Sequence, residues 1–284
     1  VPPHILVMTA TPIPRTLAMT LYGDLDVSII DELPAGRKPI ETKHLFESQR
    51  LRMFGFMKQE IAKGRQVYVV YPLIKDSEKL DLLHLEAGIE QLSYLFPLPQ
   101  YQISFVHGKL NNVDKQFGMQ RFIDGKTQIM VATTVIEVGV NVPNASVMVI
   151  ENAERFGLSQ LHQLRGRVGR GAEQSFCILM SGNKLSANSK LRLETMVKTN
   201  NGFEISEIDL QLRGPGDITG TQQSGVLNLK IADIVKVKEI LQLARHHAVK
   251  LLKEDSTMTK PEHLQMRQIF IEMSKKQNIW NYIS

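Results

Sequence analysis

The chain has 284 residues, of which 43% are hydrophobic and 22% are charged; this composition excludes wholesale disorder, and the length allows about two domains. Lys and Arg number 34 against 29 Asp and Glu, a net charge of +5 that permits binding to a polyanion without demonstrating it. The single cysteine, Cys177, excludes an internal disulfide and a zinc site built from several cysteines. It is typical of the reducing cytoplasm, where we expect this protein.

The opening sequence, VPPHILVMTATP, has no initiator Met, no basic start and no cleavage site, so it is not a signal peptide. No apolar run approaches the roughly 18 residues of a membrane span. We therefore expect no membrane contact, and a chain cut from something longer.

From the start to about residue 183, short apolar runs alternate with helical patterns. The predicted strands are His4–Thr9, Val27–Ile30, Ile40–Phe46, Gln66–Tyr71, Gln102–His107, Gln128–Ala132, Ser146–Ile150 and Ser175–Met180. The predicted helices are Arg15–Tyr22, Ser48–Lys63, Ser77–Leu95, Val113–Ile123 and Leu158–Leu164. This alternation predicts an α/β fold with a parallel, doubly wound sheet.

After about residue 184 the strand pattern stops. Helices are predicted over Leu185–Val197, Ile231–Lys253 and Pro261–Lys275, while the Gly-rich segment Gln211–Gly225 is predicted not to form a regular helix. Leu33–Pro39 (LPAGRKP) is predicted to form a turn-rich linker between domains. We therefore expect three parts: residues 1–39, the tail of a preceding domain with its linker; residues 40–183, the α/β domain; and residues 184–284, a mainly helical region.

Three arginines and three glycines fall within Arg165–Gly171, directly after a helical pattern. Glycines let a backbone approach a ligand closely, and guanidinium groups stabilise charge on a transferring phosphoryl group. A solvated basic loop is the plain alternative.

Two further segments place polar groups at the end of a predicted strand. Thr133 and Thr134 follow one strand, and Thr9–Thr16 (TATPIPRT) follows another and opens a helix. Hydroxyl and amide groups in such positions can bind phosphate, although threonines that cap a strand-end turn are the alternative.

These residues resemble a known family. Thr9–Thr16, Thr133–Ala145 and Gln163–Arg170 are similar to signature segments of superfamily 2 helicases and translocases. The string TATPIPRTLAMT is shared by RecG-type branch-migrating DNA helicases and by transcription–repair coupling translocases, and DELPAGRKP and LRGPGDITGTQQSG favour the RecG type. By this resemblance the chain is similar to the C-terminal part of the RecG family, covering almost all residues to about 255.

The resemblance implies a role for particular residues. ATP would lie between two RecA-like lobes, and the second lobe, residues 40–183, would supply Arg167 and Arg170 to its phosphates, with Gln163 helping to position them. Such an arginine is worth about 10³–10⁵ in rate. The segment that links the ATP state to the grip on DNA would contain Thr133, Thr134, Glu137, Gly139 and Asn141, the last three on the cofactor side. From the first lobe, Thr9, Thr11 and Arg15 would do the equivalent work.

The Gly-rich segment resembles the motif that couples lobe closure to translocation on duplex DNA. The matching positions are Arg213, Gly214, Gly216, Asp217 and Gln223. His107 ends a strand where the family often places backbone contacts to nucleic acid. The sequence departs from the family at Gln222, usually Arg, and at Asn141, often Asp.

The phosphate-binding Lys loop, the carboxylates that hold Mg²⁺ and the N-terminal wedge domain of the family are not among these residues. Gly125-Lys126-Thr127 imitates the end of a phosphate-binding loop, but it leads from a predicted helix to a predicted strand, the wrong order. We therefore expect this chain alone to hydrolyse ATP negligibly. No spacing of His, Cys or carboxylates predicts a metal site.

The resemblance implies an ATP-driven translocase on double-stranded DNA that remodels stalled forks and Holliday-type junctions in recombination and repair, with branched DNA as its partner. Two alternatives remain: a non-catalytic module that binds nucleic acid or a partner protein, and a transcription–repair coupling translocase.

Overall fold

A computed structural model describes residues 36–72, 78–108, 110–133, 142–171, 173–217 and 238–276, together with Leu6, Ser28 and Ile30. The predicted strand His4–Thr9 and the predicted helix Arg15–Tyr22 lie outside the described residues, as does most of Val27–Ile30. Within the described ranges the chain forms two compact units, one through Asp209 and one from Leu210 onward. Each unit is described by itself.

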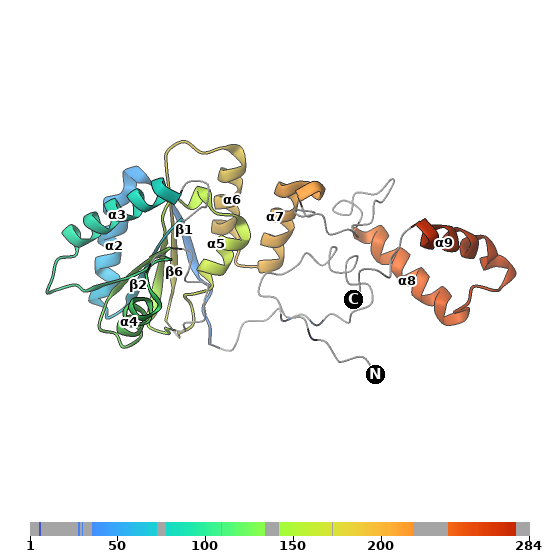
Figure 1. Cartoon of the computed structure of the whole chain (residues 1–284), viewed down its shortest axis with the longest axis horizontal. Helices are drawn as coiled ribbons and strands as arrows, with labels where there is room; N and C mark the ends of the chain where they lie inside the picture. Colours follow the sequence, from blue (N-terminus) through green and yellow to red (C-terminus); the bar gives the residue numbers. More distant parts are fainter. Residues whose placement is uncertain are drawn as a thin grey trace. The chain divides into compact units, whose positions relative to one another are not determined.

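The first unit is built on a six-stranded sheet (Figure 1). Its strands are β1 (Glu41–Phe46), β2 (Gln66–Tyr71), β3 (Ile103–Val106), β4 (Ile129–Thr133), β5 (Ala145–Ile150) and β6 (Phe176–Ser181). The order across the sheet is β1-β6-β5-β2-β4-β3, and every neighbouring pair is parallel. The predicted parallel α/β fold is therefore confirmed, with each of these strands within two residues of its expected bounds.

Helices connect the strands, as a parallel sheet requires. They are α2 (Arg50–Ala62), α3 (Glu78–Leu95), α4 (Asn112–Ile123) and α5 (Leu158–Arg165), with short 3₁₀ turns η1 (Glu47–Gln49) and η4 (Ala153–Arg155), and α6 (Ala187–Lys198) follows the last strand. The α4 helix begins at Asn111, whose side chain accepts a hydrogen bond from the backbone N–H of Asp114. This is the expected way to satisfy a free amide at a helix start.

The central strands are buried on both faces. On one face Val67 packs with Met57 of α2 and Leu92 of α3 in a single apolar cluster. Tyr68, the next residue of β2, belongs to the opposite face, where its ring lies 4.9 Å from the ring of Phe122 in α4. Because successive side chains of a strand alternate between faces, an apolar run such as QVYVVY fits a strand covered by helices on both sides.

Beyond the sheet the described elements are helical. They are α7 (Gly202–Asp217), α8 (Lys238–Glu254), the 3₁₀ turn η5 (Pro261–His263) and α9 (Leu264–Lys276). The prediction that Gln211–Gly225 contains no regular helix is wrong for residues 211–217, which form the end of α7, and residues 218–225 lie outside the described ranges. Extending an existing helix is easier than starting one, so a helix can continue into residues that would not start one.

Asp255 organises the turn between α8 and α9. Its carboxylate accepts hydrogen bonds from the backbone N–H groups of Lys260 (2.9 Å) and Thr259 (3.1 Å), and His263 Nδ1 lies 2.9 Å from Oδ2. These contacts, with that of Lys260 the largest, hold the pKa of Asp255 below its usual range. They satisfy amides at the start of η5.

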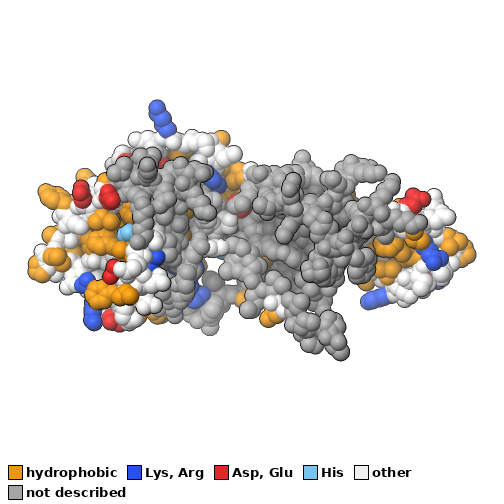
Figure 2. All heavy atoms as spheres, viewed as in Figure 1, with side chains coloured by type: hydrophobic (Ala, Val, Ile, Leu, Met, Phe, Trp, Pro, Cys, Tyr) orange, Lys and Arg blue, Asp and Glu red, His pale blue; other side chains and the backbone are white. Residues whose placement is uncertain are grey.

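Apolar side chains remain exposed on α8 and α9, and Figure 2 shows them at the surface of this unit. Those with more than half of their surface exposed are Ile240, Leu243, Met266, Ile269 and Phe270. None of the helices in the described ranges is both long and apolar enough to cross a lipid bilayer.

Candidate functional site

The arginine loop, Gly166–Gly171, continues directly from the end of α5. The backbone N–H of Arg167 donates to Leu164 O (3.0 Å), and that of Val168 to Arg165 O (3.3 Å), so the chain keeps turning tightly after the helix. The Val168 side chain is buried, which anchors the middle of the loop in the core.

The two glycines that follow bring the loop against the sheet. Gly169 has a φ of +77°, and a Cβ there would lie 2.9 Å from Cγ1 of Ile40; its N–H donates to the Ser175 hydroxyl at 3.1 Å. A Cβ on Gly171 would lie 2.7 Å from the backbone oxygen of Pro143. Ile40, Pro143 and Ser175 precede β1, β5 and β6 respectively, so the loop lies at the amino edge of the sheet.

Arg167 and Arg170 are brought together by this loop. Both side chains are partly exposed, and the Nε of Arg170 lies 3.5 Å from Gly166 O. Burial raises the pKa of Tyr68 to about 12, and the positive charges of both arginines oppose that rise. The two guanidinium groups therefore share one neighbourhood, and Gln163, also partly exposed, lies one helical turn before Arg167 on α5.

Arg165, the third arginine of the cluster, is almost completely buried, with 2% of its surface exposed. Its Nη1 donates to the backbone oxygens of Met196 and Thr199, both at 2.9 Å, and its Nη2 lies 3.2 Å from His162 Nδ1. The residue pattern by itself did not separate Arg165 from its two neighbours, whereas the resemblance assigned a role only to Arg167 and Arg170.

Two predicted nucleic-acid contacts lie at the other edge of the sheet. Thr133 is the last residue of β4 and is buried, and its hydroxyl makes no hydrogen bond within the part of the chain that the structure describes. His107 directly follows β3, and its backbone oxygen accepts a hydrogen bond from Leu110 N (3.2 Å). Both residues thus sit at the carboxyl ends of their strands, while the arginine loop lies at the amino ends.

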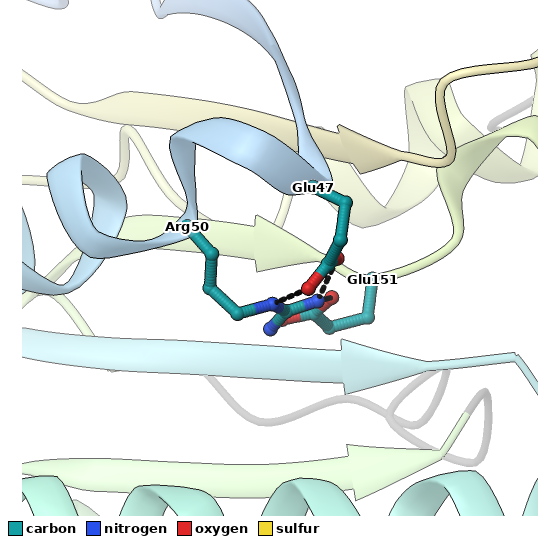
Figure 3. A network of polar contacts seen from close by, with 3 residues as sticks. All are labelled: Glu47, Arg50 and Glu151. Carbon is teal, nitrogen blue, oxygen red and sulfur yellow. Dashed lines mark hydrogen bonds and ion pairs between the residues drawn. The ribbon is translucent and has the colours of Figure 1, made fainter.

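A buried charge network, which the sequence reasoning missed, lies at the same carboxyl edge (Figure 3). Arg50, the first residue of α2, pairs through both terminal nitrogens with the carboxylate of Glu151, at 2.8 Å each. Its Nη2 also donates to Glu47 at 2.6 Å, and its Nε contacts the same carboxylate. Burial raises the pKa of Glu151. Arg50 and Glu151 are 101 positions apart, and no local sequence pattern predicts that they pair.

The other predicted site residues are not placed. Thr9, Thr11, Arg15, Thr134, Glu137, Gly139, Asn141, Gln222 and Gln223 lie outside the described residues, and Arg213, Gly214, Gly216 and Asp217 are described only as the backbone of the end of α7. Within the ranges given above, no three His, Cys, Asp or Glu side chains gather as a metal site would require.

The triplet Gly125-Lys126-Thr127 forms the turn from α4 to β4, where Gly125 has a φ of +70°. The Lys126 ammonium pairs with Asp124 at 3.4 Å. This helix-to-strand turn is the reverse of the strand-to-helix order of a phosphate-binding loop.

Comparison with known proteins accounts for both parts of the chain. A family model described as helicase conserved C-terminal domain matches residues 51–172, and one described as ATP-dependent DNA helicase RecG, domain 3, C-terminal, matches residues 199–284. ATP-dependent DNA helicase RecG of Synechocystis sp. is 52% identical over 90% of this chain and 31% of its own length. The protein of that name from Bacillus subtilis is 50% identical over 93% of this chain and 39% of its own length.

Among solved structures, RecG bound to a three-way DNA junction aligns with a TM-score of 0.63 and 42% identity, over 82% of this chain and 30% of that one. The chain therefore spans between about three and four tenths of the length of these relatives. Identity near 50% across nine-tenths of the chain, with the parallel sheet and the arginine loop in place, shows that the chain belongs to the RecG helicase family, as its C-terminal part.

Proposed function

We propose that this chain is the arginine-bearing part of an ATP-driven motor that moves on double-stranded DNA and remodels stalled forks and Holliday-type junctions in the bacterial cytoplasm. In this proposal residues 1–39 end the first RecA-like lobe, residues 40–183 form the second lobe, and residues 184–284 carry the coupling segment. The observation that carries it is the arginine loop, because it holds two partly exposed guanidinium groups together on a backbone fixed at Val168, Gly169 and Gly171.

Arg167 and Arg170 would stabilise negative charge on the phosphates of ATP, with Gln163 positioning them from α5. Paired guanidinium groups on a rigid support suit this task, because catalysis of phosphoryl transfer consists mainly of positioning and electrostatic stabilisation. Mg²⁺ would be held by carboxylates of the first lobe and would neutralise phosphate charge there.

Thr133 and His107 would face nucleic acid at the carboxyl edge, together with Thr134, while Glu137, Gly139 and Asn141 would connect that edge to the nucleotide. The Thr133 hydroxyl makes no hydrogen bond among the described residues, so it retains hydrogen-bonding capacity for a phosphate oxygen. Contacts of this kind read the backbone and not the bases, which suits a motor that must pass over any sequence.

The test is ATP hydrolysis by the full-length protein with forked and with linear DNA, comparing wild type with Arg170→Ala. We expect forks to stimulate the wild type more than linear duplex does, and the variant to bind DNA but lose about 10³-fold or more in turnover. Arg121→Ala, which removes a partly exposed arginine of α4, is the matched control and should hydrolyse ATP within twofold of wild type. Normal turnover by Arg170→Ala would show that Arg170 is not catalytic, and a wild type whose turnover does not respond to DNA would favour the binding module.

A further inference from the structure

Arg165 is a buried cation held without a carboxylate. Its guanidinium group contacts two backbone oxygens, the Thr42 hydroxyl (3.4 Å) and a ring nitrogen of His162, and no Asp or Glu among the described residues bonds to it. Burial lowers the pKa of Arg165. Such a charge is retained only where fixed dipoles replace its hydration.

Those dipoles come from the end of α6. Met196 lies in its last turn, and Thr199 is the residue that caps it. The carbonyl groups of a helix C-terminus carry a partial negative charge and lack intrahelical donors, so a cation can satisfy them. Arg165 therefore ties the end of α5 to the end of α6, two helices that are also in contact with each other.

His162 completes the arrangement from one turn earlier on α5. Burial, and to a lesser degree the charge of Arg165, lower the pKa of His162 to about 4, so its ring is neutral near pH 7. A neutral ring can accept a hydrogen bond at Nδ1, and Arg165 Nη2 lies 3.2 Å from that atom. Contacts at Nη1 and at Nη2 thereby fix the orientation of the guanidinium group.

We propose that Arg165 is a positioning residue whose tie to α6 sets the placement of Arg167 and Arg170. The inference rests on the proposed function of those two arginines. Arg165 is the last residue of α5, and the arginine loop begins at the next residue, so the tie determines where that loop starts. The other anchors of the loop, Val168, Gly169 and Gly171, come after Arg167, and on its helical side Arg165 acts together with the buried Leu164.

The test uses Arg165→Lys in the full-length protein. A lysine keeps the charge but cannot bond both carbonyl oxygens and His162 in the fork geometry of a guanidinium group. We expect kcat for ATP to fall by about 10²-fold, as for a displacement of the order of 1 Å, with KM for ATP and DNA affinity within about twofold. Arg121→Lys, on α4, is the control and should leave all three unchanged.

A double variant separates positioning from a general loss of structure. If Arg165 acts through Arg167 and Arg170, then Arg165→Lys combined with Arg170→Lys should lower kcat by less than the product of the two single losses. Independent, multiplicative losses would overturn the proposal, as would an unchanged kcat in Arg165→Lys. Normal turnover by Arg170→Lys and Arg170→Ala would instead remove the proposed function itself.

Should Arg165→Lys fail to fold, His162→Leu gives the answer. It removes one acceptor and leaves both carbonyl contacts of Arg165 in place. We expect a smaller fall in kcat, of about threefold to tenfold, again with KM unchanged. A kcat equal to that of wild type would contradict the proposal.

Discussion

The partly buried Arg50 and the buried Arg165 of the sheet unit are stabilised in opposite ways. At the carboxyl edge, burial disfavours the charge of Arg50, but the hydrogen bonds and charges of Glu47 and Glu151 outweigh it and raise the pKa of Arg50. Near the amino edge, Arg165 has carbonyl, hydroxyl and imidazole partners among the residues that the structure describes, and burial lowers its pKa. The carboxyl edge neutralises the charge of Arg50 with carboxylates. Near the amino edge the charge of Arg165 has no carboxylate partner among the described residues, and it lies beside the loop that carries Arg167 and Arg170.

The largest effect is expected at the carboxyl edge, from Glu151→Ala. Removing this carboxylate leaves Arg50 beside only Glu47, whose side chain is 55% exposed, so a buried charge loses its main partner. We expect the free energy of unfolding to fall by about 3–5 kcal/mol, measured by urea titration. Glu47→Ala removes the exposed carboxylate and should cost less than about 1 kcal/mol. Equal losses would mean that burial does not distinguish the two carboxylates.

At the amino edge, Gly169→Ala should destabilise the fold by about 1–3 kcal/mol, because alanine is strained at positive φ and its Cβ would press on Ile40. Gly125→Ala is a matched control, since Gly125 has a φ of +70° but open space around the position of a Cβ. The difference between the two losses in unfolding free energy isolates the contact with Ile40. Identical losses of unfolding free energy would show that the arginine loop can shift enough to relieve the contact with Ile40.

A further effect, confined to acid pH, is expected at His162. Its folded pKa of about 4 lies below the ordinary value of 6.5, so the unfolded chain takes up the proton first as the pH falls. Stability should therefore be intact above pH 6.5 and be lost progressively between pH 6.5 and 4. Urea midpoints measured across this range should fall less steeply for His162→Asn than for wild type. Parallel curves would contradict the assignment; His44, whose pKa burial also lowers, is present in both proteins and cancels.

The sequence predicted the strands well where burial is symmetric. β2 was bounded correctly at both ends, because a run that is apolar on both faces, between Gly64 and Pro72, has no other reading. The helix α7 was missed, because Gly214, Pro215 and Gly216 suggested a loop, whereas the helix already formed from Gly202 continues into them.

The candidate site was predicted in part. The sequence identified the arginine cluster as a group, yet nothing in residue type distinguishes Arg165 from Arg167 or Arg170. The signal that could have done so is helical spacing: Arg165 follows the buried Leu158 and Leu161 by seven and four positions, and buried Val168 follows three later. The pairing of Arg50 with Glu151 had no such local signal.

The position of β1 has a consequence for how the chain folds. Among the strands that the structure describes, this one is the first in the chain, yet its strand partner is the last, β6, in a register that pairs Glu41 with Phe176. Domains form during synthesis from the N-terminus onward, so β1 leaves the ribosome long before its partner exists. Its sequence, ETKHLF, contains Glu41 and Lys43, which pair at 2.8 Å. Charges on an unpaired strand discourage pairing with other chains. They would therefore limit aggregation through β1 until β6 has been synthesised.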